Sequence, residues 1–205
     1  MLTHTPDALV AFDLETTGLE PGRHGIVAMA AETEDGQRFR RLVIPEPHIE
    51  LDPAALAKNG YNRQRWEEWG AVDLETAMRD LQVWLFERYR FTRITPLAHG
   101  ATFDRGFLDW AQNITGTRLK LDRRWECSQA TYAFLMRAGI LPKDSASLDS
   151  LGLASGYWVD HPRDSEHQAD EDAACCMASY KWLMDVAAHH RRTFWQRLVY
   201  LFTGR

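Results

Sequence analysis

The first apolar run of the chain ends in two carboxylates, Asp13 and Glu15. The stretch from Val10 to Leu19 reads V-A-F-D-L-E-T-T-G-L, in which a run typical of a buried strand meets a turn of two threonines and a glycine. Side chains alternate across a strand, so both acids are expected to point to the same side. They repel each other unless a positive charge lies between them. Such pairs also occur on solvated strand edges, so the pair alone is weak support for a metal site.

Two later segments place further acids and a histidine at the start of expected helices. In L-A-H-G-A-T-F-D-R-G-F-L, Asp104 follows an expected strand and opens a helix, where an acid is favourable near the positive end of the helix dipole. In D-S-E-H-Q-A-D-E-D-A-A, His167 and Asp172 stand at the start of the last long helix. Taken alone, this second segment is also typical of a solvated, acid-rich first turn. Each segment by itself is explained by surface chemistry.

The three segments together form a much rarer pattern. D-x-E on the first strand, F-D after a mid-chain strand and H-x-x-x-x-D opening a late helix resemble the DEDDh exonucleases, the proofreading-type branch of the ribonuclease H-like fold. The resemblance extends from about Leu9 to Leu183, and F-D-L-E-T-T-G-L, H-G-A-T-F-D and H-Q-A-D-E-D-A follow the order of the family at similar separations. It implies a nuclease domain, which we assign to residues 1–188; the composition of residues 189–205 predicts a basic and aromatic helical tail after it.

The resemblance also implies roles for particular residues. His167 would be the general base, because the branch that uses tyrosine needs it four residues before the last acid, where this chain has Gln168. Asp170 and Glu171 are then bystanders. The four acids that would hold two divalent cations, Mg²⁺ or Mn²⁺, are Asp13, Glu15, Asp104 and Asp172.

Four further residues resemble those that contact the substrate. Thr16 and Leu19 would meet the terminal nucleotide, and His99 and Phe103 would flank the substrate path. The chain departs from the family at two places: Gly100 stands where asparagine is frequent, and Ala28 stands where an acidic or amide residue is frequent. Both departures concern substrate positioning rather than the proposed catalytic residues.

The expected chemistry is two-metal hydrolysis of a phosphodiester. Carboxylate oxygens suit hard cations such as Mg²⁺ and Mn²⁺, whereas neither the cysteine spacing nor the paired histidines suit zinc. His167, with an ordinary pKa of about 6.5, can accept the proton of the attacking water near neutrality. We therefore expect a 3′–5′ exonuclease that releases nucleoside monophosphates from nucleic acid with a free 3′ end, DNA more than RNA. An exoribonuclease, a related endonuclease and a catalytically idle nucleic-acid-binding or scaffold module remain alternatives.

Hydrophobic periodicity predicts an α/β domain with a mixed central sheet flanked by helices. The expected strands cover 8–16, 25–33, 38–44 and 94–98, with a hairpin turn over 34–36. The expected helices cover 54–59, 74–89, 103–112, 128–138, 147–155 and 171–188. Strands first, then strands alternating with helices, agree with the ribonuclease H-like fold that the resemblance implies.

Composition is that of an ordinary globular chain. Its 205 residues are 45% hydrophobic and 26% charged, which is enough for one good core. The first residues lack a basic segment followed by an apolar one, and no apolar run reaches the length of about 18 residues that a membrane span requires, so we expect a cytoplasmic protein. The formal net charge of −5 argues against a protein that coats nucleic acid through bulk charge, yet not against an enzyme that grips a few nucleotides. Cys127, Cys175 and Cys176 are expected to be reduced and structural.

The C-terminal tail combines apolar and basic residues at helical spacing. We expect a terminal helix docked on the domain's own core. The same composition suits a partner groove, a homodimer contact or a membrane surface, and a replication or repair protein is one partner that the tail would recruit. The residues that carry this pattern are Arg191, Arg192, Phe194, Trp195, Arg197, Leu198, Val199, Leu201, Phe202 and Arg205.

Overall fold

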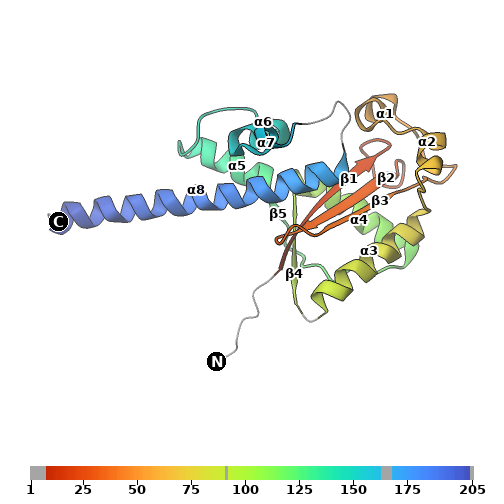
Figure 1. Ribbon diagram of the computed structural model, residues 1–205, viewed down its shortest axis with the longest axis horizontal. Coiled ribbons are helices and arrows are strands. Elements are labelled where there is room, and N and C mark those ends of the chain that lie inside the picture. Colours follow the sequence, from red (N-terminus) through yellow and green to blue (C-terminus); the bar gives the residue numbers. More distant parts are fainter. Residues whose placement is uncertain (1–7, 91, 163–167, 204–205) are drawn as a thin grey trace.

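A five-stranded mixed sheet forms the centre of the domain (Figure 1). The structure, a computed structural model, describes residues 8–90, 92–162 and 168–203, with side chains up to residue 193. Its strands lie in the order β3-β2-β1-β4-β5. The mixed α/β architecture expected from the sequence is confirmed.

The sheet is antiparallel on one side of its first strand and parallel on the other. The first three strands pair as antiparallel neighbours, and the last two run parallel to β1. The strands are β1 (Ala8–Thr16), β2 (Ile26–Thr33), β3 (Arg38–Leu42), β4 (Ile94–Ala98) and β5 (Glu126–Cys127). The register between β1 and β2 shifts between Glu15 and Thr16, next to the two acids.

The described ranges form eight helices, half of which begin after a capping Asp, Asn or Ser. The side chains of Asp52, Asn62, Asp73 and Ser147 each accept a backbone N–H in the first turn that follows, which stabilises the helix start. The helices are α1 (Pro53–Asn59), α2 (Arg63–Glu68), α3 (Leu74–Tyr89), α4 (Ala101–Thr115), α5 (Ser128–Arg137), α6 (Leu148–Ser155), α7 (Tyr157–Asp160) and α8 (Ala169–Thr203).

Side-chain alternation along β1 separates the two faces of the sheet. The even-numbered residues Val10, Phe12 and Leu14 are buried in the main core with α3 and α4. On the other face, Ala11 is buried against Cys176 of α8. Figure 1 shows α8 crossing the sheet on the side away from α3 and α4. The odd-numbered face of β1 is therefore the face that carries Asp13 and Glu15 toward α8.

Small side chains let the start of α8 approach the sheet closely. Ala28 and Ala30 of β2 pack against Ala169 and Ala173, one turn apart on α8, and all four are buried. A methyl group at each contact leaves no bulk between helix and strand. Ala28, where the DEDDh pattern often has a polar residue, thus has a packing role in this chain.

The sequence predicted most of the elements, but not all of their bounds. The bounds of β1, α3 and β4 agree with the prediction, whereas α4 begins earlier and ends later than expected. The short elements α2, β5 and α7 were not predicted. They contain six, two and four residues, too few for a periodic pattern to emerge.

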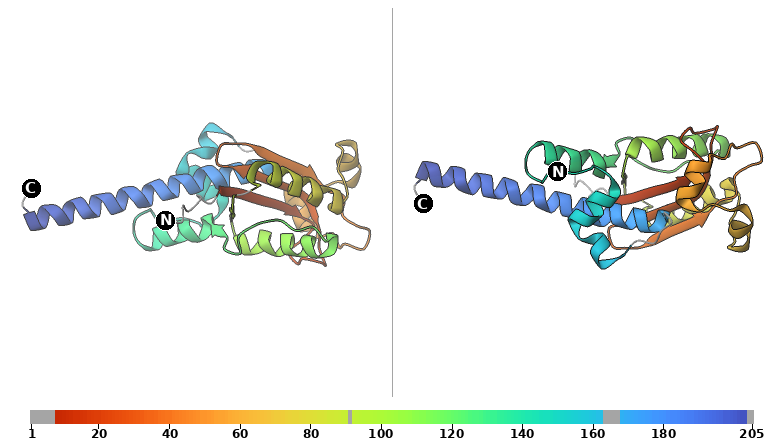
Figure 2. Two further views of the ribbon diagram at one scale, coloured as in Figure 1. Left: turned by 90° about the horizontal axis from the view of Figure 1, so that it is seen from below. Right: turned by 90° about the horizontal axis from the view of Figure 1, so that it is seen from above.

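Residues 189–203 of the C-terminal tail are helical and do not form a separate element. The tail continues α8, which forms one helix of 35 residues. Among the side chains described, the last buried one in α8 is that of Leu183, and His189 to Arg192 are exposed. Figures 1 and 2 show the C-terminal part of α8 leading away from the sheet. Recruitment of a partner or a second copy by this segment stays a prediction. Within the described ranges, no helix is both long and apolar enough to cross a membrane.

The packing of α8 on β2 leads to a stability prediction. Ala173→Leu inserts three carbon atoms into a fully buried contact, so it should lower the free energy of unfolding by about 1–3 kcal/mol. Urea denaturation measures the loss. Ala188→Leu, on the half-buried part of α8 beyond Leu183, is the matched control and should change stability much less. Equal effects of the two variants would contradict the close contact.

Candidate active site

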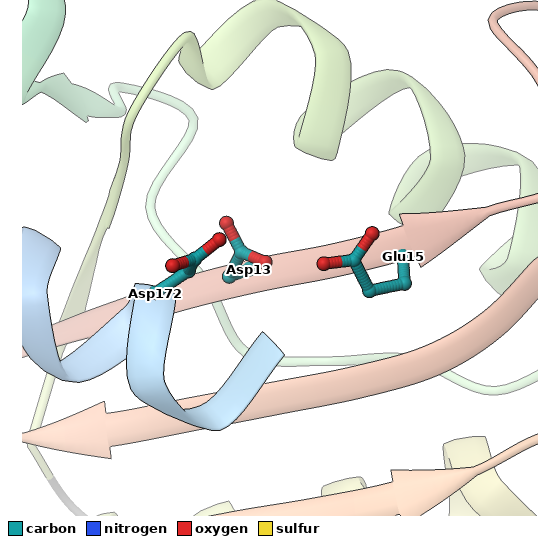
Figure 3. A group of neighbouring side chains, drawn as sticks. All are labelled: Asp13, Glu15 and Asp172. Carbon is teal, nitrogen blue, oxygen red and sulfur yellow. The ribbon is translucent and has the colours of Figure 1, made fainter. Parts of the chain in front are cut away.

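Three carboxylates from two elements meet above the sheet. Each of Asp13, Glu15 and Asp172 offers an oxygen that lies within 4.8 Å of the others. Asp13 and Glu15 share a face of β1, as the sequence predicted, and Asp172 projects from the first turn of α8 (Figure 3). The two strand acids are half-buried and Asp172 is buried, so their mutual repulsion is only partly screened by water.

Asp104 lies beside this group, in the first turn of α4. Its side chain is 3% exposed, and its Oδ1 accepts the backbone N–H of Leu14 at 3.2 Å. The pKa of Asp104 is raised to about 8: burial, the largest cause, and the charge of Glu15 raise it, and hydrogen bonds from the Leu14 N–H and its own backbone lower it in part. Asp104 is not among the three acids that lie within 4.8 Å of one another, but it faces the same strand from the adjoining helix.

An ion pair helps to hold the first turn of α8 in place. Arg40 of β3 contacts Asp170 at 3.3 Å, and the backbone N–H of Asp172 donates to Gln168 at 3.0 Å. Asp170, expected to be a bystander, therefore ties α8 to the edge of the sheet. His167, the expected general base, lies outside the described residues, immediately before Gln168.

The turn after β1 is fixed by hydrogen bonds to its own and neighbouring backbone. Thr16 Oγ1 donates to Gly18 O at 2.6 Å, and Asn59 Nδ2 donates to Thr16 O at 2.9 Å. A Cβ on Gly18 would lie 2.2 Å from the His24 ring, so only glycine fits without movement of that ring. Thr16 is consequently buried, whereas the side chain of Leu19 is 74% exposed at the tip of the turn. Of these two expected substrate contacts, Leu19 is the one open to a ligand.

His99 belongs to a buried hydrogen-bond network. Its Nε2 lies 3.0 Å from Ala146 O, which can only accept, so Nε2 carries the proton. Burial lowers the pKa of His99, which favours the neutral ring and leaves Nδ1 to accept from the Ser128 hydroxyl at 2.9 Å. The Ser128 Oγ also lies 3.4 Å from the Sγ of Cys176, which is one turn beyond Asp172 on α8. Both ring nitrogens of this expected substrate contact are thus engaged inside the protein.

Phe103 packs mainly within the domain. Its ring lies 5.0 Å from that of Phe107, and it borders the main core while staying partly exposed. The helix that carries it begins after Gly100, whose φ of 85° is in the left-handed region. Glycine and asparagine adopt this conformation most readily, so Gly100 meets the same backbone requirement as the asparagine frequent in the DEDDh pattern.

The network residues Ser128 and Cys176 were not identified from the sequence. A lone serine at a helix start and a buried cysteine carry no motif, and their link to His99 depends on three elements that meet only in the fold. The one available signal was spacing: Cys176 follows Asp172 by one helical turn and so shares its face. All three cysteines are free, as expected.

Several solved structures with a similar arrangement of elements are those of exonucleases. The nuclease domain of 3′hExo, a DEDDh family member bound to rAMP, has a TM-score of 0.68 and 15% identity over 89% of this chain and 94% of that chain. E. coli exonuclease I in complex with a dA13 oligonucleotide has a TM-score of 0.65 and 18% identity over 91% of this chain. This chain spans 44% of the exonuclease I chain.

A third similar structure is that of a 3′-exonuclease with specific recognition of the 3′ end of a histone mRNA stem-loop. Its TM-score is 0.64, at 14% identity over 88% of this chain and 65% of that chain. No protein-family model matches the chain, and no curated protein sequence matches it. The likeness lies in the arrangement of helices and strands: this chain has the ribonuclease H-like fold of the DEDDh exonuclease domains.

Proposed function

We propose that this chain is a metal-dependent 3′–5′ exonuclease that releases nucleoside monophosphates from nucleic acid. The observation that carries the proposal is the meeting of Asp13, Glu15 and Asp172 within 4.8 Å, in a fold shared with DEDDh exonucleases. Carboxylates that lie close together at a partly buried point repel each other, which costs free energy. A bound cation would offset that cost.

The donor set fits hard divalent cations. Carboxylate oxygens are the ligands that Mg²⁺ and Mn²⁺ prefer, and Asp13, Glu15 and Asp172 would hold the metal, with Asp104 as the fourth acid. When bound, two such ions supply an activated water and stabilise negative charge on the phosphate and the leaving oxygen. Because a zinc-bound form of the E. coli exonuclease I complex with single-stranded DNA has been solved, a metal titration of this chain should include Zn²⁺.

The residues of the chain itself orient the substrate and move a proton. The rigid turn after β1 presents Leu19 at its tip, where it can pack against the terminal base. The hydrogen bond from the Leu14 N–H fixes the orientation of the Asp104 carboxyl group. His167 is the proposed acceptor of the proton from the attacking water, on the basis of its sequence position ahead of α8.

DNA is the preferred substrate in this proposal, with RNA as the second candidate. Similar folds have been solved with a deoxyoligonucleotide and with rAMP, so the fold itself is compatible with both. The topology of the substrate distinguishes the proposed exonuclease from an endonuclease with the same fold. We expect a linear single strand to be degraded with Mg²⁺ or Mn²⁺ while a circular strand of the same sequence stays intact. Cleavage of the circle would show endonuclease activity instead.

Loss of one strand acid should remove both metal binding and hydrolysis. Asp13→Asn keeps the shape of the side chain but removes a charged ligand from the three-acid group. We expect no detectable hydrolysis, and much weaker Mn²⁺ binding by isothermal titration calorimetry. Asp185→Asn changes an exposed acid further along α8 and should leave both unchanged. Wild-type Mn²⁺ affinity in Asp13→Asn would remove this residue from the metal site.

The proposed base should affect turnover more than binding. His167→Ala should lower kcat by about 10²–10⁴-fold, the usual contribution of general base catalysis, while the Kd for a single-stranded oligonucleotide stays near that of wild type. Single-turnover kinetics and fluorescence anisotropy measure the two quantities. A kcat close to that of wild type would exclude His167 from the mechanism.

Asp104 should make the metal-free protein less stable as the pH rises. Its folded pKa of about 8 lies above the ordinary value of 3.8, so between these values the folded state keeps a proton that the unfolded state releases. This term in the free energy of unfolding is therefore greatest below the ordinary pKa and is lost as the pH rises through about 8. Asp104→Asn, which is neutral throughout, should lose the dependence and should exceed wild type by about 1–3 kcal/mol near pH 8 in EDTA.

Thermal unfolding across this pH range measures the difference between the two proteins. Added Mn²⁺ should stabilise wild type and reverse the order, because the cation favours the ionised carboxylate. Parallel pH profiles for wild type and Asp104→Asn in EDTA would contradict the raised pKa.

A further inference from the structure

Two stacked tryptophans, Trp66 and Trp69, form an aromatic platform at the C-terminal end of α2. Trp66 is buried and donates its Nε1–H to Val27 O of β2 at 2.7 Å. Trp69 stacks on it, with ring centroids 5.6 Å apart and planes 29° from parallel. Despite this contact, 56% of Trp69 remains exposed. A large aromatic ring is thus held rigidly while much of its surface faces solvent.

An arginine adds a positive charge to this platform. The Arg65 guanidinium lies 5.0 Å from the Trp69 ring centroid and 5.4 Å from that of Trp66, and it donates to the backbone O of Gly60. A cation held over the ring and an exposed aromatic surface are the two features on which single-stranded nucleic acids bind: bases stack on aromatic rings, and arginine contributes cation–π and phosphate contacts.

Trp69 borders a hollow of about 690 Å³ at the edge of the sheet. Arg40 and Arg41 of β3 line the hollow, together with Gln168, the residue before α8. Arg41 is held by Asp80 at 2.7 Å, as Arg40 is by Asp170, and both arginine side chains are more than 40% exposed. Because each arginine faces a carboxylate, stacking on Trp69 rather than net charge must supply most of the affinity for a ligand.

Two structural links connect this hollow to the acid cluster. The carbonyl of Gln168 accepts the N–H of Asp172, so the hollow begins one helical turn from a cluster acid. Across the sheet, Asp13 pairs with Ala30 and Ala30 pairs with Arg40, which places all three on one face. Neighbouring strands are about 4.8 Å apart, so Arg40 lies about 10 Å from Asp13 along this row.

We propose that the hollow lined by Trp69, Arg40 and Gln168 binds the part of a single-stranded nucleic acid that lies on the 5′ side of the nucleotide being removed. A base of the strand stacks on Trp69, and backbone phosphates reach the arginines at the edge of the sheet. This inference rests on the proposed exonuclease function, because it assigns the acid cluster and the hollow to one strand. Stacking is tolerant of sequence, so the site favours strand length over particular bases.

The test separates binding from hydrolysis. Binding of single-stranded DNA and RNA of about 12 nucleotides is measured by anisotropy in EDTA, where no metal-dependent cleavage occurs. Trp69→Ala should weaken the Kd about ten-fold, and Trp69→Phe, which keeps an aromatic face, should recover most of the affinity. Phe134→Ala removes a ring that is 62% exposed on α5 and should have no effect. The DNA and RNA arms show which strand the hollow prefers.

Hydrolysis of two substrate lengths completes the test. With Mg²⁺, Trp69→Ala should raise KM for the longer strand but leave kcat/KM for a dinucleotide unchanged, because a dinucleotide does not extend into the hollow. Wild-type affinity for the long strand in Trp69→Ala would overturn the inference, even if the enzyme is an active exonuclease. Binding that depends on Trp69 without hydrolysis of any strand would support the hollow and contradict the proposed exonuclease.

Discussion

The structure depends on holding like charges together. Asp13 and Glu15 are fixed by the alternation of one strand, but Asp172 comes from a helix more than 150 residues later, and it reaches them only because α8 lies close to the sheet. The alanines of β2 and α8 make that approach sterically possible, and the Arg40–Asp170 ion pair holds the first turn of α8 against the sheet. Apolar packing elsewhere must offset the electrostatic cost until a cation binds.

Further buried hydrogen bonds join the elements that carry the acids to neighbouring helices. Asp104 accepts a hydrogen bond from the strand that carries Asp13 and Glu15, so α4 and β1 are joined at the level of the cluster. On the other side, Cys176 lies against Ser128 and through it His99, which links α8 to the starts of α5 and α6. Such contacts restrict the positions of the acids more tightly than the strand and helix alone. The proposed catalysis by a bound metal would require such preorganisation.

The sequence was most informative where chemistry and periodicity coincide. The spacing of the D-x-E pair predicted that both acids share one face of β1, because side-chain alternation along a strand is local. The apolar stripe of α3 predicted that helix to its last residue. It was least informative where tertiary contacts decide. The hydrogen bonds of His99 to the Ser128 hydroxyl and the Ala146 carbonyl join distant elements, and no local pattern reveals them. Likewise, α2 and the exposure of Trp69 depend on where Trp66 is buried.

We propose that Asp13, Glu15 and Asp172 hold the metal with which the protein degrades a nucleic acid strand from its 3′ end. The most direct measurement incubates the protein with single strands labelled at the 3′ or the 5′ end, in Mg²⁺, Mn²⁺ or EDTA. We expect release of mononucleotide from the 3′ label and a shortening ladder from the 5′ label, and we expect EDTA to abolish both. Absence of cleavage in any strand, with Mn²⁺ bound at Asp13, Glu15 and Asp172, would contradict this proposal.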